Sequence, residues 1–566
     1  MHTRTFKPLV ILGLLYSLLF VLLSCSADDN RYGFTPTNPN LSLTQKEFEV
    51  SKEKGQLEVN FESNLPWRVE SNANWISSDL LRGDVGKHTL KITYDRNLAL
   101  EDRVGSLTIK ITDDSQEKIT LKQAKASIDD TYTHYYVKEN GQGDGSSWEQ
   151  ATTLDNALQL ALNNNDIIHL AEGTYHPGAH ELIPNAAEKD KTFLIQANIK
   201  LIGGYPKEAT TGSTPNPQAQ TILSGKNQSV HVMTILAPKL TGLKVTLENL
   251  TITAGNSDAG ASNLTLKGMN IPRDHGAGLL VIASDVSLNN CKIVKNQSGR
   301  HAAGIYADKQ SVLTINHSII NENTGVNANS NGGGIFLNNS KAFIHFSDIS
   351  FNKAGGVSGG IQTLNNSEIN LTNVTVTNNQ ARANGGGIYH RDNSKSIMVN
   401  TYFYNNVATA GEGGAISTHN GAVIHLINST LYKNESSKNF GAINNQANNT
   451  IYLYNSLVFD NPSTANNNGI NPIGTLTAVK SGIHNQLFGE ENVVTGTFSA
   501  QDVQTADPEQ LTPNSTSSPI ATQGMSVEEL MELRNQLSIE VPIEVFTSDL
   551  NSKARTGSKT IGAYRL

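Results

Sequence analysis

An asparagine recurs about once every 27 residues through the middle of this 566-residue chain. Successive members are 27, 29, 27, 27, 28 and 27 positions apart. The seven members, called the Asn ladder below, are Asn296, Asn323, Asn352, Asn379, Asn406, Asn434 and Asn461. Each follows an apolar residue by three positions; these residues are Ile293, Ile320, Ile349, Val376, Phe403, Leu431 and Val458. A period of about 20 to 50 residues is typical of a solenoid, whose neighbouring repeats bury one another.

Other columns keep the same period. Apolar residues stand eight positions before the Asn ladder, at Leu288, Ile315, Ile344, Leu371, Met398, Leu426 and Leu453. After each ladder asparagine comes a glycine-rich turn and a short apolar run, as in Gly333-Gly334-Ile335 and Gly386-Gly387-Ile388. These runs are short and β-branched and do not follow a 3.6-residue period, so they predict strands. We expect two or three short strands per repeat, stacked in parallel, with asparagine at corners because it tolerates left-handed backbone and its amide can bond along the stack.

The pattern of residues 134–566 resembles the right-handed parallel β-helix of pectate-lyase-like proteins. The Gly-Gly-Ile turns and elements such as Ile349-Ser350-Phe351-Asn352 also resemble the repeats of chlamydial polymorphic outer-membrane proteins. The resemblance implies an all-β chain whose β-helix has regular repeats over about 276–461 and a C-terminal cap over about 500–566. It implies no particular activity, because this fold carries lyases, hydrolases, adhesins and inert spikes.

The N-terminus has the features of a processing signal. Residues 1–24 combine a basic start with an apolar run, and Leu22-Leu23-Ser24-Cys25 resembles a bacterial lipoprotein box. Cys25 would then be the lipidated first residue of the mature chain, with residues 25–40 as a tether. The acids Asp28-Asp29 resemble the surface-export signal of Bacteroidota lipoproteins. The resemblance implies a protein anchored to the outer membrane by lipid and facing the cell exterior.

Residues 41–125 have a different sequence pattern: six or seven short runs of alternating apolar and polar residues, which predict the strands of a small β-sandwich. Trp67, Trp75-Ile76, Asn97, Arg103-Val104-Gly105 and Gln123 resemble the BACON module. That family was named for presumed carbohydrate binding. The two tryptophans have the pattern of core residues, which favours a spacer over a glycan binder, although both interpretations stay open.

Both ends of the predicted β-helix carry capping signals. Leu154, Ala157, Leu158 and Ala161 recur at helical spacing and predict an amphipathic helix that covers the first repeat. Ser526-Val527-Glu528-Glu529 is a capping box that predicts a helix to about Leu537. Ile561-Gly562-Ala563-Tyr564 resembles the closing strand of similar proteins. The segments 205–230, 257–275 and 465–500 fit no repeat and are expected to be loops.

Composition excludes several classes of function. The net charge of −8 has the wrong sign for a protein that binds nucleic-acid phosphates. There are only two cysteines, and Cys291 falls in an inward column, so neither a disulfide framework nor a cysteine metal site is expected. We predict no cofactor and no metal. Two histidines, His275 and His301, are expected to stack one repeat apart, but a third ligand is not evident.

A catalytic hypothesis concerns the strand after each Gly-Gly-Ile turn. Tyr389, His390 and Arg391 follow one such turn, and His419 lies one repeat later. Arg391 would neutralise a uronate carboxylate, and a histidine or Tyr389 would remove the C5 proton in a β-elimination. The alternative is a solvated corner with ordinary polar residues. No two acids share an aligned column on adjacent repeats, which disfavours glycosidases and calcium-dependent lyases.

A binding hypothesis concerns aromatic residues expected to point outward. Tyr404, Tyr432 and Phe459 stand two positions before the ladder on successive repeats, and Tyr306 and Phe336 follow the glycine turns. Stacked rings would give a platform for sugars, or would simply stabilise the last repeats. The sequence therefore favours a non-catalytic surface protein that binds polysaccharide or host glycan. The alternatives are a polysaccharide lyase acting on uronate-containing glycan and a structural stalk or adhesin.

Overall fold

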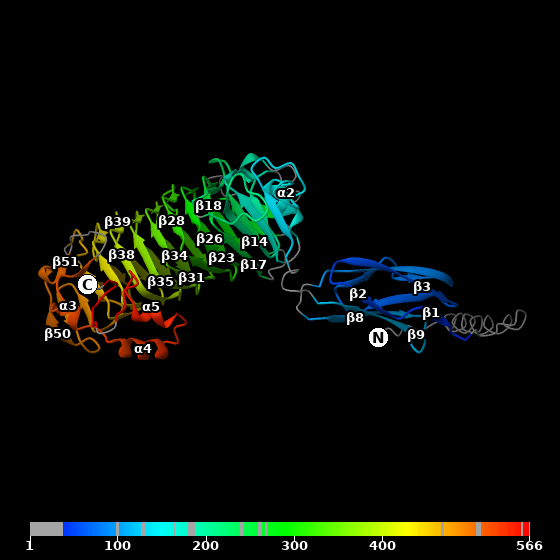
Figure 1. Cartoon of the computed structure of the whole chain (residues 1–566). Helices are drawn as coiled ribbons and strands as arrows, with labels where there is room; N and C mark the ends of the chain where they lie inside the picture. The colour runs from blue at the N-terminus through cyan, green and yellow to red at the C-terminus, as the bar shows by residue number, and fades with distance from the viewer. Residues whose placement is uncertain are drawn as a thin grey trace, which may run out of the picture. The chain divides into compact units, whose positions relative to one another are not determined.

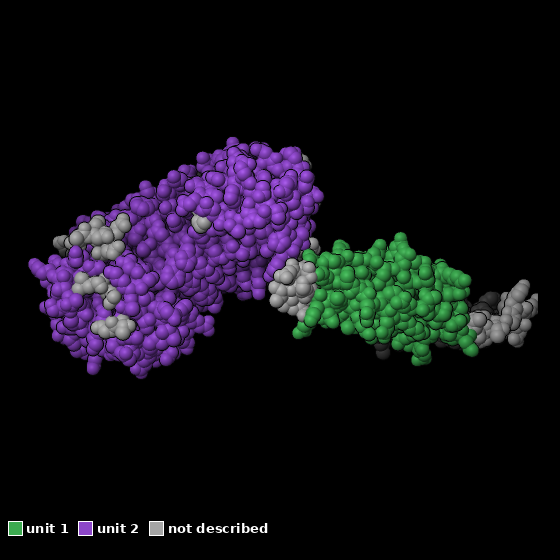
Figure 2. Space-filling model, viewed as in Figure 1, with its two compact units in different colours: residues 1–131 green, residues 132–566 purple. Residues whose placement is uncertain are grey.

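The computed structural model describes residues 38–97, 101–125, 132–162, 165–178, 187–216, 218–237, 242–257, 263–266, 269–465, 469–504, 511–555 and 558–564. The chain forms two compact units, residues 1–131 and 132–566 (Figure 2). The expected signal peptide, Cys25 and most of the tether lie outside the described residues.

The first unit contains two β-sheets that pack as a sandwich. One sheet has the order β1 (Leu41–Leu43), β3 (Gly55–Ser63), β7 (Gly86–Tyr94) and β5 (Ile76–Ser78). The other has the order β2 (Glu47–Val50), β9 (Gln116–Gln123), β8 (Arg103–Lys110), β4 (Trp67–Ser71) and β6 (Arg82–Gly83). Leu90, Ile92 and Ile109 are fully buried between them. The predicted sandwich is confirmed, with short extra strands beyond the expected six or seven.

The second unit is a parallel β-solenoid, as predicted (Figure 1). One turn runs through β22 (Leu279–Ile282), β23 (Ser284–Asn289), β24 (Lys292–Val294) and β25 (Gln297–Ser298), and each strand pairs in parallel with its counterpart one turn later. We call the four sides of the solenoid faces 1 to 4 in this order. The expectation of two or three strands per repeat is therefore corrected, because each repeat contains four strands.

Face 1 is a nine-stranded sheet. Its other strands are β13 (Phe193–Ile195), β16 (Met233–Leu236), β26 (Ile305–Asp308), β30 (Ile335–Asn338), β34 (Ile361–Leu364), β37 (Ile388–Arg391), β40 (Ile416–His419) and β44 (Ile443–Asn445). Face 4 is a seven-stranded sheet of two-residue strands. Its others are β19 (Asn256–Ser257), β29 (Thr324–Gly325), β33 (Lys353–Ala354), β36 (Gln380–Ala381), β39 (Val407–Ala408) and β43 (Glu435–Ser436).

Faces 2 and 3 are joined by two ten-residue strands that bend from one face to the other, β35 (Glu368–Thr377) and β38 (Lys395–Tyr404). Face 2 also holds β10 (His134–Val137), β11 (Asp166–Ala171), β14 (Ile199–Tyr205), β17 (Leu243–Glu248), β27 (Val312–Asn316), β31 (Lys341–His345), β41 (Val423–Ile427), β45 (Thr450–Tyr454) and β47 (Thr475–Val479). Face 3 also holds β12 (Gly173–Tyr175), β15 (Thr221–Ser224), β18 (Leu250–Thr253), β28 (Ile319–Asn321), β32 (Asp348–Ser350), β42 (Thr430–Tyr432), β46 (Leu457–Phe459) and β48 (Ser481–Ile483).

The Asn ladder lies inside the solenoid, at the corner between faces 3 and 4. All seven side chains are fully buried. Asn379 shows the pattern: its Nδ2 donates to Oδ1 of Asn406 at 3.0 Å and to the carbonyl of Ile349 at 2.8 Å. Its Oδ1 accepts from Nδ2 and the backbone N–H of Asn352, both at 3.0 Å. An amide is needed here because it both donates and accepts along the stack.

The expected left-handed backbone belongs to a neighbouring column instead. The residue immediately before each ladder asparagine has a positive φ, for example 54° at Phe351 and 54° at Asn378. The residue six positions before the ladder is also left-handed, as at Phe346 with φ 49°. Asparagine is common in these columns because it tolerates this conformation. The ladder residues are therefore selected by hydrogen bonding, and the corners are made by the residues beside them.

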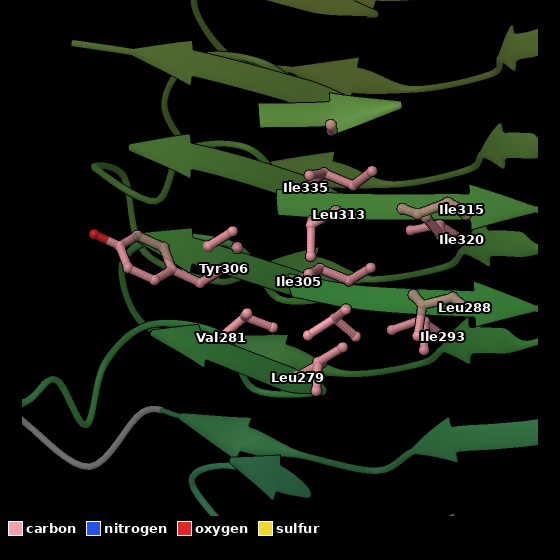
Figure 3. Close-up of a cluster of buried hydrophobic side chains, with 14 of the residues drawn as sticks. Leu279, Val281, Leu288, Ile293, Ile305, Tyr306, Leu313, Ile315, Ile320 and Ile335 are labelled. Carbon is pink, nitrogen blue, oxygen red and sulfur yellow. The ribbon is translucent and has the colours of Figure 1, made fainter. Parts of the chain in front are cut away.

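The core between the faces is aliphatic. Leu279, Ile305 and Ile335 stack on successive turns of face 1, opposite Leu288 and Ile293 (Figure 3). A second polar ladder lies at the corner between faces 2 and 3, where hydroxyls such as Ser429 and Ser456 accept from backbone N–H groups of the preceding turn. Hydrogen-bonded side chains thus line two corners of the core.

The N-terminal cap forms as predicted. Helix α2 (Leu154–Leu160) buries Leu154, Ala157 and Leu158 against the first turns. At the other end α4 (Val527–Gln536) begins at Ser526 with the expected capping box. It packs with α5 (Ile543–Thr547) on Val399 and Ile427 of face 2. The remaining helices of the second unit are short: α3 (Pro519–Thr522), η2 (Glu188–Asp190) and η3 (Ala500–Asp502).

Three expectations for irregular segments are wrong. The expected loop 205–230 contains β15, and 257–275 contains a hairpin of β20 (Leu264–Leu266) and β21 (Met269–Ile271). The expected loop 465–500 contains β47, β48, β49 (Gln486–Phe488) and β50 (Val494–Thr497). The expected closing strand is also wrong, because residues 561–564 form no strand; they lie on face 3 as an irregular segment with bends at Gly562 and Ala563. The cap also contains a short hairpin of β51 (Val503–Gln504) and β52 (Thr512–Pro513). Within the described residues no helix is long and apolar enough to cross a membrane.

Candidate functional site

The predicted lyase residues do not converge on one site. Along β37, Ile388 and His390 point into the solenoid, and Tyr389 and Arg391 point out, because side chains alternate along a strand. His390 is fully buried, and its Nδ1 lies 2.7 Å from Oγ1 of Thr363 on the previous turn. Burial lowers the pKa of His390 to about 3. The expectation that His390 faces a substrate is therefore corrected.

The other three members of that set lie outside the solenoid. Arg391 and His419 are register partners on adjacent turns, but His419 Nδ1 is paired with Oε1 of Gln446 at 2.8 Å. The guanidinium of Arg391 lies 3.8 Å from Asp392 and over the ring of Tyr389. Tyr389 is only 7% exposed, and burial raises the pKa of its hydroxyl. No acid–base pair aimed at a common point is formed by these residues.

Tyr306 and Phe336 point outward, as expected, but are covered. Figure 3 shows the ring of Tyr306 directed away from the aliphatic core. The glycine turn before β22 passes so close to Tyr306 that a Cβ at Gly276 would lie 2.9 Å from the Cβ of Tyr306. His275 packs against Tyr306 with ring centroids 4.8 Å apart, and His301 packs against Phe336 at 4.5 Å. Exposure of 6% and 2% leaves neither ring available as a sugar platform.

His275 and His301 stack one turn apart, as predicted, with ring centroids at 4.6 Å. The Nδ1 of His275 is hydrogen-bonded to the carboxylate of Asp274, and burial lowers the pKa of His301 to about 3. Throughout the part of the chain that is described, no group of three or more His, Cys, Asp or Glu side chains is placed to hold a metal ion.

The aromatic column on face 3 forms, but most of it is covered. Tyr404, Tyr432 and Phe459 stack with centroid separations of 5.8 and 6.1 Å. Tyr432 and Phe459 are only 4% and 7% exposed, because the C-terminal cap packs over them with residues such as Phe498. The expected platform is therefore corrected to one partly open ring, that of Tyr404.

A groove lies on face 3 where this cover ends, and we call it the face-3 groove. It has a volume of about 290 Å³. The residues that line it are Asp348, Ser350, Phe351, Thr375, Thr377, Asn378, Tyr402, Tyr404 and Tyr564. Most come from three successive turns, on β32, β35 and β38, which pair in parallel register. The last, Tyr564, comes from the C-terminal segment and packs edge-on against Tyr402 with centroids 5.0 Å apart.

The groove combines aromatic rings with a polar cluster. Tyr402 and Tyr404 lie on the same side of β38 with nearly parallel rings, 11° apart, so Tyr404 is held in place from behind. Phe351 stands at the neighbouring corner and is 52% exposed. In the same groove Asp348 accepts hydrogen bonds from Thr375, at 2.6 Å, and from Ser350. Apolar rings with a few convergent polar groups are typical of a small-ligand site.

Sequence reasoning found Tyr404 but missed its partners. Asp348, Thr375 and Tyr402 all stand four positions before a ladder asparagine, and Ser350, Thr377 and Tyr404 stand two positions before it. The repeat register therefore contained the signal that these two columns adjoin on one face. Tyr564 had no such signal, because the segment that carries it is irregular.

Trp67 of the sandwich is a core residue, as expected. It is 3% exposed and contacts Phe61 edge-on at 4.9 Å. Trp75 is only partly buried: it packs against the core, and the guanidinium of Arg103 lies 4.2 Å from its ring.

Comparisons identify the first unit only. Residues 40–126 match the family model described as the viral BACON domain, which confirms the resemblance drawn from residues 41–125. No curated protein sequence matches the chain. A Bacteroides ovatus GH5 xyloglucanase in complex with a XXXG heptasaccharide aligns at 12% identity, covering 44% of this chain and 56% of that chain, with a TM-score of 0.15. The crystal structure of Escherichia coli ybhc aligns at 13% identity, covering 56% and 72%, with a TM-score of 0.24. The chain thus spans little more than half of the xyloglucanase chain, and such low TM-scores support no inference.

Proposed function

We propose that this protein is a non-catalytic saccharide-binding protein whose site is the face-3 groove. The solenoid supplies a rigid support, because each turn is bonded to the next along all four faces. The BACON domain acts as a spacer, since Trp67 is buried in its core and Trp75 packs against that core beneath Arg103. Cys25 carries a lipid anchor that attaches the protein to the outer membrane, with the protein facing the cell exterior.

The observation that carries the proposal is the pairing of open aromatic rings with one hydrogen-bonded carboxylate. A pyranose ring has an apolar C–H face, which packs on an aromatic ring, and a rim of hydroxyls. Tyr404 and Phe351 supply ring surface in the same groove as Asp348. Each carboxylate oxygen can accept about two hydrogen bonds, so Asp348 keeps acceptor capacity beyond the two hydroxyls that already donate to it.

The same groove does not support glycosidase chemistry. Hydrolysis of a glycosidic bond generally needs two carboxyl groups on opposite sides of the bond. Asp348 is the one carboxylate among the nine residues that line the groove. The lyase hypothesis loses its site as well, because His390 is enclosed in the core and His419 is paired elsewhere.

The test is binding of the purified mature protein to an array of plant, microbial and host glycans. Two variants remove the ring surface, Tyr404→Ala and Phe351→Asn. Asparagine suits position 351 because the backbone there is left-handed, with φ 54°. We expect each variant to lose at least tenfold in affinity for the array ligand, since burying an aromatic side chain in a contact contributes about 1.5–3 kcal/mol.

Phe346→Asn is the matched control. Phe346 lies on the same turn, at the other end of β32, with φ 49° and 42% exposure, and it is not part of the groove. It should bind as the parent does. The proposal is wrong if no glycan binds, or if Phe346→Asn weakens binding as much as Phe351→Asn.

The anchor is tested separately. Cys25→Ser should abolish incorporation of labelled palmitate and move the protein from the membrane to the soluble fraction, in a host that processes bacterial lipoproteins. Labelling that persists in this variant would rule out Cys25 as the lipidated residue.

A further inference from the structure

We infer that the face-3 groove receives the end of a saccharide chain and that the sugar units it receives carry no acidic group. This inference rests on the proposed saccharide binding and adds a ligand class and a mode of binding. Two independent features carry it: the charge of the groove, and the way in which the C-terminal segment closes the groove at one end.

The charge of the groove comes from Asp348. Its carboxylate lies at the centre of the polar cluster, bonded to Ser350 and Thr375. None of the nine lining residues is a lysine or arginine. A uronate or sulfate placed over this cluster would lose its water and meet a like charge, both of which cost free energy. A sugar hydroxyl would instead donate to the carboxylate in a charge-assisted hydrogen bond.

The closed end of the groove is made by residues 562–564. The backbone N–H of Ala563 donates to Oγ1 of Thr430 at 2.8 Å, on β42. The Cα of Gly562 lies directly over Thr430 and Leu457, where any Cβ would collide with the threonine hydroxyl. Tyr564 then meets Tyr402 on β38. The segment therefore runs along the outward residues of face 3, over β46 and β42, and Tyr564, the last residue described, borders the groove.

The neighbouring aromatic column is closed at the same level. Tyr404 is half-buried and borders the groove, but Tyr432 on the next turn is covered by the cap. A chain lying along the solenoid axis thus meets a wall at β42. In the other direction face 3 continues to β28, where the outward side chains of Ile319 and Asn321 are partly exposed.

The open length of the groove fits a short chain end. The groove extends across the three strands β32, β35 and β38. Adjacent strands are about 4.8 Å apart, so the groove is about 10 Å long. The terminal unit would lie against Tyr404 and Tyr564, and the rest of the chain would leave past Phe351 toward β28. Recognition of an internal segment would need the groove to continue on both sides.

The charge is tested by calorimetric titration with matched probes. The probes are neutral gluco-, manno- and xylo-oligosaccharides of four to six units, and the gluco and manno chains after oxidation at C6 to uronates. We expect oxidation to weaken binding at least tenfold. Asp348→Asn should weaken binding of the neutral probe about tenfold and reduce the preference over the oxidised probe, while Asp285→Asn, an exposed acid on face 2, should change neither. Equal or tighter binding of the oxidised probe overturns the inference.

The end-on mode is tested by stoichiometry. Size-fractionated neutral polymers of increasing length are titrated at fixed molar concentration of chains. If the groove takes chain ends, the number of protein molecules bound per chain stays constant as length grows. A number that rises in proportion to length overturns the end-on mode.

Failure of the inference can be told apart from failure of the proposed function. If Tyr404→Ala abolishes binding but oxidised probes bind as well as neutral ones, the groove is the saccharide site and its predicted selectivity is wrong. If binding survives Tyr404→Ala and Phe351→Asn, the groove is not the site, and both proposals fall.

Discussion

At the scale of single residues, the interior of the solenoid is decided by hydrogen bonds as much as by apolar burial. A ladder asparagine such as Asn379 serves as donor to two groups and acceptor from two others, all out of contact with water. A buried polar group left without its partner costs about 1–3 kcal/mol. The ladder therefore stabilises the stack because each asparagine bonds to the turn before it and to the turn after it, so that loss of one member affects both neighbours.

Asn379→Ala interrupts the ladder at its centre. It removes the acceptor for two N–H groups of Asn352, the amide donor to the carbonyl of Ile349 and one of the two donors to Oδ1 of Asn406. We expect the free energy of unfolding to fall by about 3 kcal/mol or more. Asn378→Gly is the control, because glycine accepts the left-handed backbone at that corner; chemical denaturation measures both. Equal losses in the two variants would contradict the role assigned to the ladder.

His390 gives a pH dependence whose sign follows from its burial. Its pKa is about 3 in the folded chain and about 6.5 when unfolded, so the unfolded state binds the extra proton as pH falls below about 6.5. Stability is retained above that pH and is lost progressively toward pH 3. For this one group the loss between pH 7 and pH 5 is roughly 2 kcal/mol.

The measurement is the denaturation midpoint at pH 7 and pH 5. His390→Gln should show a smaller drop between the two pH values than the parent protein. His419→Gln, at an exposed position, should show the same drop as the parent. A drop in His390→Gln that matches the parent would show that His390 does not contribute to the acid sensitivity.

At the scale of elements, the strands follow from the sequence and the cap does not. The repeat register predicts which residues of β32, β35 and β38 are neighbours, and two-residue alternation already places His390 on the same side as Ile388. The predicted lyase set failed because it joined consecutive residues that point to opposite sides. No periodic pattern predicts that residues 561–564 cover face 3. Ala563 bonds to Thr430, 133 residues earlier in the chain, and the segment has no regular structure.

Arg555 holds that C-terminal segment in place. It is 1% exposed, and its guanidinium donates to the carbonyls of Ser548, Thr560, Gly562 and Ala563. Arg555→Met keeps the bulk but removes every donor. We expect the segment to detach, so that limited proteolysis cleaves it several-fold faster while the solenoid stays intact.

Lys553→Met is the control, because Lys553 is exposed two residues away. Its cleavage rate should equal that of the parent. If Arg555→Met is cleaved no faster than the control, the hydrogen bonds of the Arg555 guanidinium do not hold the C-terminal segment in place.

At the scale of the whole molecule, the repeat produces a rigid surface, and the irregular C-terminal cap interrupts it. Regular turns stack equivalent residues on four faces, and the face-3 groove lies where the cap residue Tyr564 packs beside Tyr402. This explains why the sequence predicts the fold well and the site only in part: Tyr404 belongs to a column, whereas the groove depends on what covers the rest of that column.

The most direct test of the account is a crystal structure of the protein with the tightest-binding oligosaccharide from the glycan array. The account predicts a sugar ring packed on Tyr404, with a hydroxyl within hydrogen-bonding distance of the Asp348 carboxylate and the chain leaving past Phe351. A saccharide found on the BACON domain, or on any other face of the solenoid with the face-3 groove empty, would contradict it.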